Sequence, residues 1–193
     1  MTRVKSLEIN QIIKLLKVGK IGVIPTDTIY GIVGSALNPQ TVEKIYQLRK
    51  RNLDKPFIIL IGSMEDLEEF GIQLTKDQRN FLNSHWPNPL SIILPISGEK
   101  FKYLHRGKYS LAFRMPKDEK LLELLKKVGP LVAPSANFEG EKPSETIAEA
   151  KKYFGDSVDF YIDEGNKSVT ASTLILLNSD GTFKIVRQGQ YKL

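Results

Sequence analysis

The sequence contains no cysteine among its 193 residues. This absence excludes disulfides, thiolate metal ligands and cysteine nucleophiles, and it is consistent with a reducing compartment. No segment approaches the roughly 20 consecutive apolar residues that a membrane-spanning helix requires. The N-terminal segment carries Glu8, Asn10 and Lys14 where a signal peptide would have its apolar core. We therefore expect a cytoplasmic protein that does not associate with a membrane.

Three widespread functional motifs are also absent. There is no P-loop, no glycine-rich dinucleotide-binding fingerprint and no G-x-S-x-G nucleophile elbow. The two histidines, His85 and His105, lie in separate segments, and neither has a second histidine at metal-ligand spacing. We expect both to be surface or loop residues and not a catalytic pair. An ATP-dependent enzyme with this sequence would bind phosphates through side chains and loop amides.

Composition and charge narrow the class of protein only slightly. Hydrophobic residues make up 41% and charged residues 26% of the chain, as in ordinary globular proteins. The formal net charge of +6 suits anionic partners such as nucleotides or RNA, although a soluble, lysine-rich surface is the commoner cause. The sequence shows no linker and no second zone of composition. We expect residues 1–193 to form a single domain.

Hydrophobic periodicity predicts an α/β protein. Helices are expected over residues 7–18, 39–50 and 121–128, from Ser144 toward Tyr153, and after apparent capping boxes that begin at Ser63 and Thr75. Strands are expected over residues 21–25, 29–33, 56–61, 90–96, 110–115, 131–133, 158–162, 173–177 and 182–186. Because helices and strands alternate irregularly, with adjacent strands near the end, we expect a mixed sheet and not a purely parallel one.

A cluster of cations follows the predicted helix over residues 39–50. It consists of Arg49, Lys50, Arg51 and Lys55. The helix dipole alone favours positive charge at this position, but capping needs fewer cations than this. Arginine offers two parallel donors to a phosphate, and lysine offers a mobile point charge. The cluster therefore indicates a polyphosphate-binding segment.

Polar turns follow several of the predicted strands. PTDTIYG (25–31) and APSAN (133–137) offer hydroxyls, a carboxylate and an amide, while Arg114 and Arg187 stand at strand ends. Each has an ordinary alternative explanation, because such hydroxyls often cap their own turns and such arginines often face solvent. The WPNP turn (86–89) is expected to serve packing and chain geometry. Together the arginines and hydroxyls indicate a ligand pocket at the strand ends of one sheet.

Seven short segments occur in the order of a known family: PTDTIYGI, RKRNLDKP, WPNPL, LAFRMP, APSAN, AST and VRQG. Through these segments, from about Gly19 to Gly189, the chain resembles the YrdC-like family of threonylcarbamoyl-AMP synthases. The resemblance implies an α/β fold in which a twisted mixed sheet is flanked by helices and carries a basic concave cleft. It also implies the short form of the family, without the extra C-terminal domain of longer members.

The resemblance further implies a nucleotidyltransferase that joins L-threonine, bicarbonate and ATP into threonylcarbamoyl-adenylate and pyrophosphate. The threonine contacts carry over to Thr28, Arg114, Ser135 and Ser172. The ATP contacts carry over to Arg51, Lys55, Ser110, Asn137 and Arg187, with Ser144 or Thr146 as a further phosphate contact. No covalent nucleophile and no protein-held metal are expected, because magnesium would arrive with ATP. Other proteins would transfer the product to tRNA, so tRNA or double-stranded RNA is a further expected partner.

Four positions depart from the family pattern, and two alternative functions stay open. Asn52 replaces a frequent proline, and Asn88 a frequent glycine. Arg49 stands where lysine is usual, and Leu60 where many members carry a histidine near threonine. The first alternative is an RNA-binding module without catalysis, which the lack of an aromatic-rich RNA-binding signature opposes. The second is an enzyme that forms carbamoyl-adenylate, like the related domains of hydrogenase-maturation proteins. Those domains usually belong to much larger chains, which opposes this alternative.

Overall fold

The computed structural model describes residues 8–167 and 170–193. Its helices are α1 (Ile9–Lys17), α2 (Pro39–Leu48), the 3₁₀ helix η1 (Glu65–Phe70), α3 (Lys76–His85), α4 (Lys102–His105), α5 (Glu119–Val128), α6 (Ile147–Phe154) and the 3₁₀ helix η2 (Gly155–Ser157). Its strands are β1 (Gly22–Ile24), β2 (Gly31–Ser35), β3 (Ile58–Leu60), β4 (Leu90–Pro95), β5 (Ser110–Arg114), β6 (Leu131–Val132), β7 (Phe160–Tyr161), β8 (Thr173–Leu177) and β9 (Phe183–Arg187). None of the described helices has the length and apolar character needed to cross a membrane.

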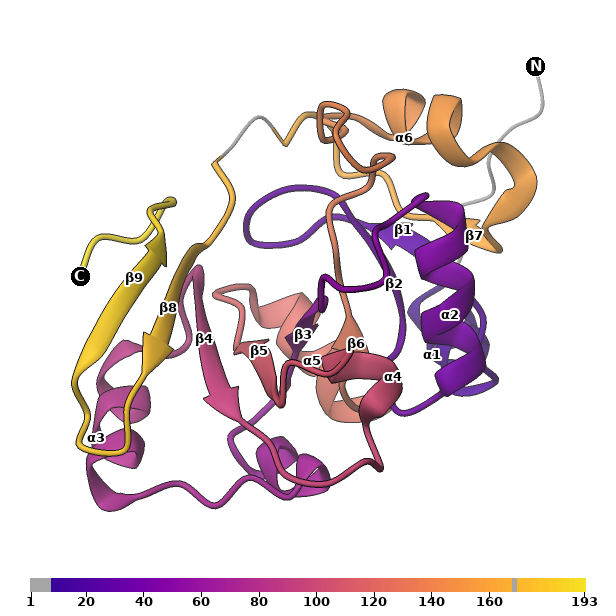
Figure 1. The fold of residues 1–193 in the computed structure, drawn as a ribbon. Helices are drawn as coiled ribbons and strands as arrows, with labels where there is room; N and C mark the ends of the chain where they lie inside the picture. Colours follow the sequence, from indigo (N-terminus) through magenta and orange to yellow (C-terminus); the bar gives the residue numbers. More distant parts are fainter. Residues whose placement is uncertain (1–7, 168–169) are drawn as a thin grey trace.

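The strands form one sheet in the order β7–β1–β2–β6–β3–β5–β4–β8–β9. The pairs β1–β7, β3–β5 and β4–β8 are parallel, and the other neighbours are antiparallel. The predicted mixed sheet is therefore confirmed. Figure 1 shows that the sheet twists between β7 at one edge and the β8–β9 hairpin at the other.

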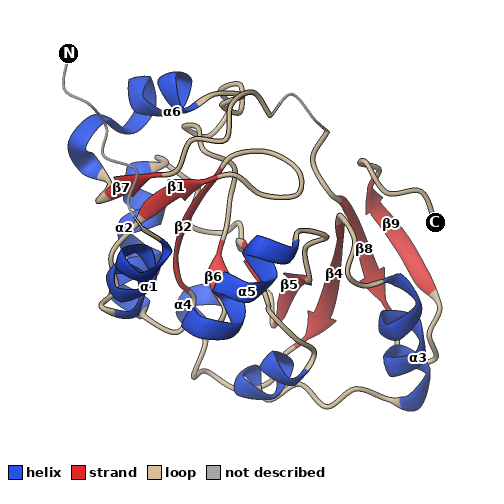
Figure 2. Ribbon diagram, turned by 180° about the vertical axis from the view of Figure 1, so that it is seen from behind, coloured by secondary structure: helices blue, strands red, loops and turns tan. Residues whose placement is uncertain are grey.

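Alternating side chains divide the core between the two faces of the sheet, as the two-residue repeat of a strand requires. In β1, Val23 belongs to one buried cluster and Ile24 to the other; in β3, Ile59 and Leu60 divide in the same way. The face that includes Ile24 and Leu60 packs against α1 and α5, which Figure 2 shows in front of the sheet. The opposite face packs against α2, η1, α3, α4 and α6. The predicted flanking of the sheet by helices is thus confirmed.

Two helix starts follow the prediction. Asn38 caps α2 by accepting a hydrogen bond from Thr41 N–H, and Pro39 occupies the first turn, where its missing N–H does no harm. Thr75 and Gln78 form a reciprocal capping box at the start of α3. Local sequence signals therefore place both helices correctly.

Two other predicted helix starts were wrong. The segment after Ser63 forms the 3₁₀ helix η1 and not an α-helix, and the Asp66 carboxylate accepts the N–H groups of Gly62 and Ser63 at 2.7 and 3.2 Å. The bond from Ser63 N–H is one half of the predicted capping box, but the N-cap of η1 is Met64 and no side chain caps it. Helix α6 begins later than expected, because Thr146 and not Ser144 caps its first turn.

The prediction that both histidines are surface or loop residues was wrong for His105. Its side chain is fully buried at the end of α4, a short helix that the hydrophobic periodicity did not predict. The ring stacks on Tyr109 with 4.8 Å between ring centroids, and Nδ1 accepts a hydrogen bond from Gly107 N–H. His85 lies partly exposed at the end of α3.

Candidate active site

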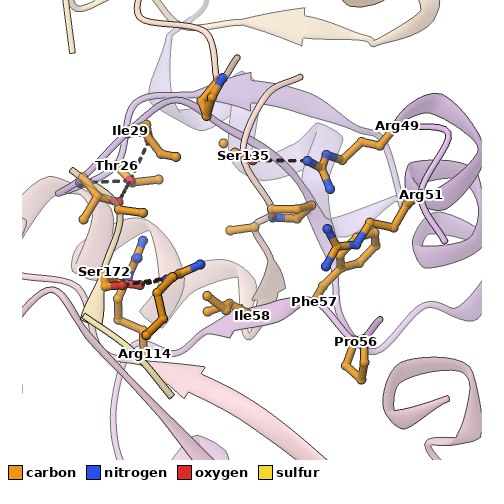
Figure 3. Close-up of a pocket in the computed structure, with 17 residues that line it drawn as sticks. Thr26, Ile29, Arg49, Arg51, Pro56, Phe57, Ile58, Arg114, Ser135 and Ser172 are labelled. Atoms are coloured by element: carbon orange, nitrogen blue, oxygen red, sulfur yellow. Dashed lines mark hydrogen bonds between the residues drawn. The ribbon is translucent and has the colours of Figure 1, made fainter. Parts of the chain in front are cut away.

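A cavity of about 240 Å³ lies where strands of the sheet give way to loops (Figure 3). Its walls come from parts of the chain that are distant in sequence, namely the loop after β1, the end of α2, the start of β3, the loop after β6 and the β8–β9 edge. The residues that line it are Thr26, Thr28, Ile29, Gly31, Arg49, Arg51, Pro56, Phe57, Ile58, Arg114, Ala133, Pro134, Ser135, Pro143, Ala171, Ser172 and Arg187. The lining therefore combines four arginines with several hydroxyl groups.

The cavity brings together all four predicted threonine contacts, which are Thr28, Arg114, Ser135 and Ser172. Two of the predicted ATP contacts, Arg51 and Arg187, also line it. Figure 3 shows Arg49 and Arg51 on one side of the cavity, with Arg49 bonded to Ser135, and Arg114 and Ser172 on the other side. The expected convergence of guanidinium and hydroxyl groups is therefore observed, while the role of each residue toward a ligand stays a prediction.

Thr26 holds the loop after β1 in shape. Its Oγ1 donates to Ile29 O at 2.7 Å and accepts from Thr28 N–H at 3.1 Å. The hydroxyl oxygens of Thr26 and Thr28 are 3.0 Å apart, and both side chains are buried. Because Thr26 gives its one hydroxyl hydrogen to Ile29, Thr28 is the donor in that pair. The free lone pair of the Thr28 oxygen can then accept a hydrogen bond from a ligand in the cavity.

A buried ion pair fixes the arginine at the end of β5. Arg114 Nη2 lies 3.2 Å from Asp27 Oδ1, and the exposed fractions of the two side chains are 6% and 3%. Asp27 Oδ2 also accepts the N–H of Lys117 at 3.0 Å. Burial lowers the pKa of Arg114, with a further decrease from the charge of Arg187, and Asp27 opposes both. Arg114 Nε is buried without a hydrogen-bond partner among the described residues, while the side chain itself lines the cavity.

Arg49 links the end of α2 to the loop after β6. Its Nε donates to Asn137 O at 3.1 Å, and its Nη2 donates to Ser135 Oγ at 3.1 Å and to Asn137 Oδ1 at 3.3 Å. The side chain is 2% exposed, and within the described chain its Nη1 has no partner. Burial, with repulsion from Arg51, lowers the pKa of Arg49 to about 10, so it stays charged at neutral pH. The family resemblance implies no ligand contact for Arg49, whereas the cation cluster of the sequence includes it.

Arg187 and Ser172 meet at the β8–β9 edge. Arg187 Nη2 donates to Ser172 O at 2.9 Å, and Ser172 Oγ lies 2.8 Å from Ser91 Oγ on the neighbouring strand. The backbone at Gly189 lies close to the backbone of Ala171 and Ser172. Only glycine permits this contact, because a Cβ at position 189 would lie 2.2 Å from Ala171 O. Gly189 N–H also donates to a side-chain hydroxyl of β8 at 2.9 Å. The close backbone contact therefore explains a glycine directly after the arginine motif.

The other predicted ATP contacts do not line the cavity; they are Lys55, Ser110, Asn137, Ser144 and Thr146. Asn137 is buried beneath Arg49, and its Nδ2 donates to the carbonyls of Phe138 and Glu141. Ser144 is buried as well, and its Oγ donates to Ala136 O. These two side chains shape the loop after β6, so any contact that they make with ATP stays a prediction.

Lys55, Ser110 and Thr146 have separate environments. Lys55 is exposed and ion-paired with Glu139 at 2.7 Å, Ser110 begins β5, and Thr146 caps α6. Leu60 packs in the core on the α1–α5 face and does not line the cavity. In the described parts of the chain, no three His, Cys, Asp or Glu side chains are grouped so that they could hold a metal ion.

Comparison with known proteins places the chain among proteins of the same fold. A family model for Sua5, YciO and YrdC proteins, described as telomere recombination, matches residues 14–189. A threonylcarbamoyl-AMP synthase of Pyrococcus abyssi is 32% identical over 179 residues, covering 90% of this chain and 52% of the relative. A putative threonylcarbamoyl-AMP synthase of Mycobacterium tuberculosis is 29% identical over 174 residues, covering 90% of this chain and 80% of the relative.

The solved structures include P. abyssi Sua5 in complex with L-threonine. That structure superposes with a TM-score of 0.86 at 29% identity, and the match covers 97% of this chain and 56% of Sua5. The chain thus spans about half the length of the archaeal relatives and four fifths of the mycobacterial one.

Proposed function

Since the chain belongs to the Sua5/YciO/YrdC family, we propose that it is a threonylcarbamoyl-AMP synthase. In this reaction L-threonine, bicarbonate and ATP give threonylcarbamoyl-adenylate and pyrophosphate. One observation carries the proposal: the hydroxyls of Thr28, Ser135 and Ser172 line the same cavity as four arginines. Such a lining suits two anionic substrates, one small and one polyphosphate.

The hydroxyls of the cavity, together with Arg114, suit threonine. Arg114 lines the cavity, and a guanidinium pairs well with a carboxylate. The Thr28 oxygen can accept from the ammonium or hydroxyl group of the substrate. Arg114 would therefore hold the carboxylate, and the nearby hydroxyls would orient the amine.

Other arginines of the same cavity suit the phosphates of ATP. The threonine amine combines with carbon dioxide from bicarbonate to form a carbamate and release a proton. A carbamate oxygen then attacks the α-phosphorus of ATP, and the bond to pyrophosphate breaks. No protein nucleophile is needed, so catalysis depends on holding two anions together and balancing the charge on the phosphates. Arg51 and Arg187 line the cavity and are suited to that work.

Magnesium enters this proposal as part of the substrate, Mg-ATP. The described residues provide no group of carboxylates and histidines that fits a resident metal ion, and the cavity is lined by cations and hydroxyls. Magnesium commonly keeps several waters and binds through substrate phosphates. The adenylate would pass to proteins that modify tRNA, and we place this step in the cytoplasm, with tRNA as the eventual acceptor.

The test is pyrophosphate release from Mg-ATP with threonine and bicarbonate each added or withheld. Release that requires both supports the proposal. Release that is independent of threonine, or RNA binding without any cleavage of ATP, would reject it. Replacing threonine by serine, or bicarbonate by carbamoyl phosphate, separates this reaction from related adenylations.

A further inference from the structure

Glu139 lies between the cation cluster and the loop after β6. Its Oε1 accepts from Lys55 Nζ at 2.7 Å and lies 3.6 Å from Arg51 Nη1. Its Oε2 accepts the backbone N–H of Asn52 at 2.5 Å. One carboxylate therefore contacts both of the cluster's cations that are predicted to bind ATP, together with a loop amide.

The two loops are also joined without the Glu139 carboxylate. The backbone N–H of Glu139 donates to Arg49 O at 2.9 Å. Arg49 makes its own side-chain bonds to Ser135 and Asn137, and Lys50 Nζ lies 4.2 Å from the centre of the Phe138 ring. The carboxylate is thus an addition to an existing connection between the loops.

The donors around Glu139 are those that a phosphate group uses. An ammonium, a guanidinium and a backbone N–H bind phosphate oxygens as readily as carboxylate oxygens. The hydrogen bonds from Lys55 and from Asn52 N–H lower the pKa of Glu139 to about 2, so the group is an anion at neutral pH. Arg51 also has a buried Nε without a partner among the described residues, so this guanidinium is not saturated by Glu139.

We propose that Glu139 sets the affinity of the pocket for polyphosphates by acting as an internal anion on Arg51 and Lys55. The inference rests on the proposed function, in which these cations bind the phosphates of ATP. The carboxylate has a single charge and its pairs are partly exposed, with 57% of the Lys55 side chain accessible. A triphosphate with several charges can displace such a pair, because exposed ion pairs are weak. After the reaction the carboxylate can return to the same donors, which favours release of pyrophosphate.

Glu139→Gln tests this inference with Glu141→Gln as the matched control. Both variants remove one negative charge from the same loop, but Glu141 forms none of the ion pairs found in the described residues. Titration calorimetry with inorganic pyrophosphate, and separately with Mg-ATP, measures the dissociation constants. We expect both ligands to bind about threefold to tenfold more tightly to Glu139→Gln, which is the range of one exposed ion pair. The control should bind as the wild type does.

Turnover supplies a second readout. The KM for ATP should fall in Glu139→Gln, and added pyrophosphate should inhibit the variant at lower concentration than the wild type. Raising the salt concentration should reduce the difference between the proteins, because salt screens partly exposed pairs. Glu139→Ser also removes the charge, and its KM for ATP and its inhibition by pyrophosphate should match those of Glu139→Gln. This second variant keeps the test valid if Glu139→Gln folds poorly.

Three results would overturn the inference: weaker binding in Glu139→Gln, unchanged binding, or equal changes in the variant and the control. Weaker binding would make Glu139 a residue that positions Arg51 and Lys55. Pyrophosphate binding also separates this inference from the proposed function. Tighter binding without threonine-dependent turnover would reject only the function, whereas no polyphosphate binding to any of the proteins would reject both.

Discussion

Arg114 and Asp27 form an ion pair with 3.2 Å between Nη2 and Oδ1, and both side chains are almost entirely removed from solvent. Asp27 comes from the loop after β1 and Arg114 from the end of β5, so the pair connects two strands that are not neighbours in the sheet. The pair both compensates the buried charge of Arg114 and orients its guanidinium toward the cavity. Under the proposed function, stability and threonine binding would therefore depend on the same contact.

Asp27→Asn should lower both stability and the affinity for threonine. The amide can still accept the N–H of Lys117, but it leaves the charge of Arg114 uncompensated. We expect a loss of about 3 kcal/mol in the free energy of unfolding, because breaking one side of a buried pair is strongly unfavourable. Urea denaturation measures the loss, and the KM for threonine should rise. Asp54→Asn, the same change at an exposed position, should leave both quantities near the wild-type values; equal effects of the two variants would contradict the prediction.

Arg51→Ala should impair turnover far more than folding. The side chain lines the cavity, and its interaction with Glu139 spans 3.6 Å, which is long for a stabilising pair. Loss of one charge-assisted contact to ATP should reduce kcat/KM for ATP about 10- to 100-fold. The melting temperature should change little. Arg79→Ala, an exposed site on α3, is the control; a fall in melting temperature that parallels the loss of activity would make Arg51 structural.

Gly189→Ala should displace the β8–β9 edge from the cavity. The added Cβ would lie 2.2 Å from Ala171 O, and backbone atoms cannot yield as a flexible side chain can. We expect a loss of about 1–3 kcal/mol in stability from overpacking. Activity should fall at least about tenfold, because Ser172 and Arg187 would shift from their positions. Gly98→Ala meets no atom within 4 Å and should cost only the strain of its positive φ, without loss of activity.

The contribution of Glu139 to stability should depend on pH in the acid range. Its pKa is lowered from 4.5 to about 2 in the folded protein, chiefly by hydrogen bonds from Lys55 and from Asn52 N–H. A lowered carboxylate pKa stabilises the fold above the unfolded value, and the contribution disappears as pH falls through the folded value. The difference in stability between wild type and Glu139→Gln should therefore be constant above about pH 4.5 and shrink as the pH falls to about 2. Urea midpoints across this range provide the measurement; a difference that grows on acidification would contradict the assigned interactions.

Patterns within short stretches of sequence predicted much of the fold. The Asn38–Pro39 start of α2 and the capping box of α3 depend on residues within one turn, and both were correct. The segment after Ser63 forms a 3₁₀ helix and not the expected α-helix, although Asp66 accepts Ser63 N–H as a capping box requires. The burial of His105 could not be predicted either, since it depends on the position of α4 against the rest of the fold.

The candidate site was predicted in part. The resemblance identified Thr28, Arg114, Ser135 and Ser172, and all four line the cavity. Asp27 and Glu139 were missed as partners of the arginines, because each acts on cations more than 80 residues away in sequence. No local pattern reports such a contact. The single domain over residues 1–193 and the individual ligand contacts stay predictions.

The position of Arg187 on the edge strand has a consequence for biosynthesis. Strand β8 pairs in parallel with β4, and β9 is attached to the sheet only through β8. Because a ribosome delivers the chain from the N-terminus, the earlier loops can assemble while Ser172 and Arg187 are still unmade. Of the four arginines that line the cavity, a nascent chain would thus acquire Arg187 last, so incomplete translation products should remain inactive even when most of the sheet has formed.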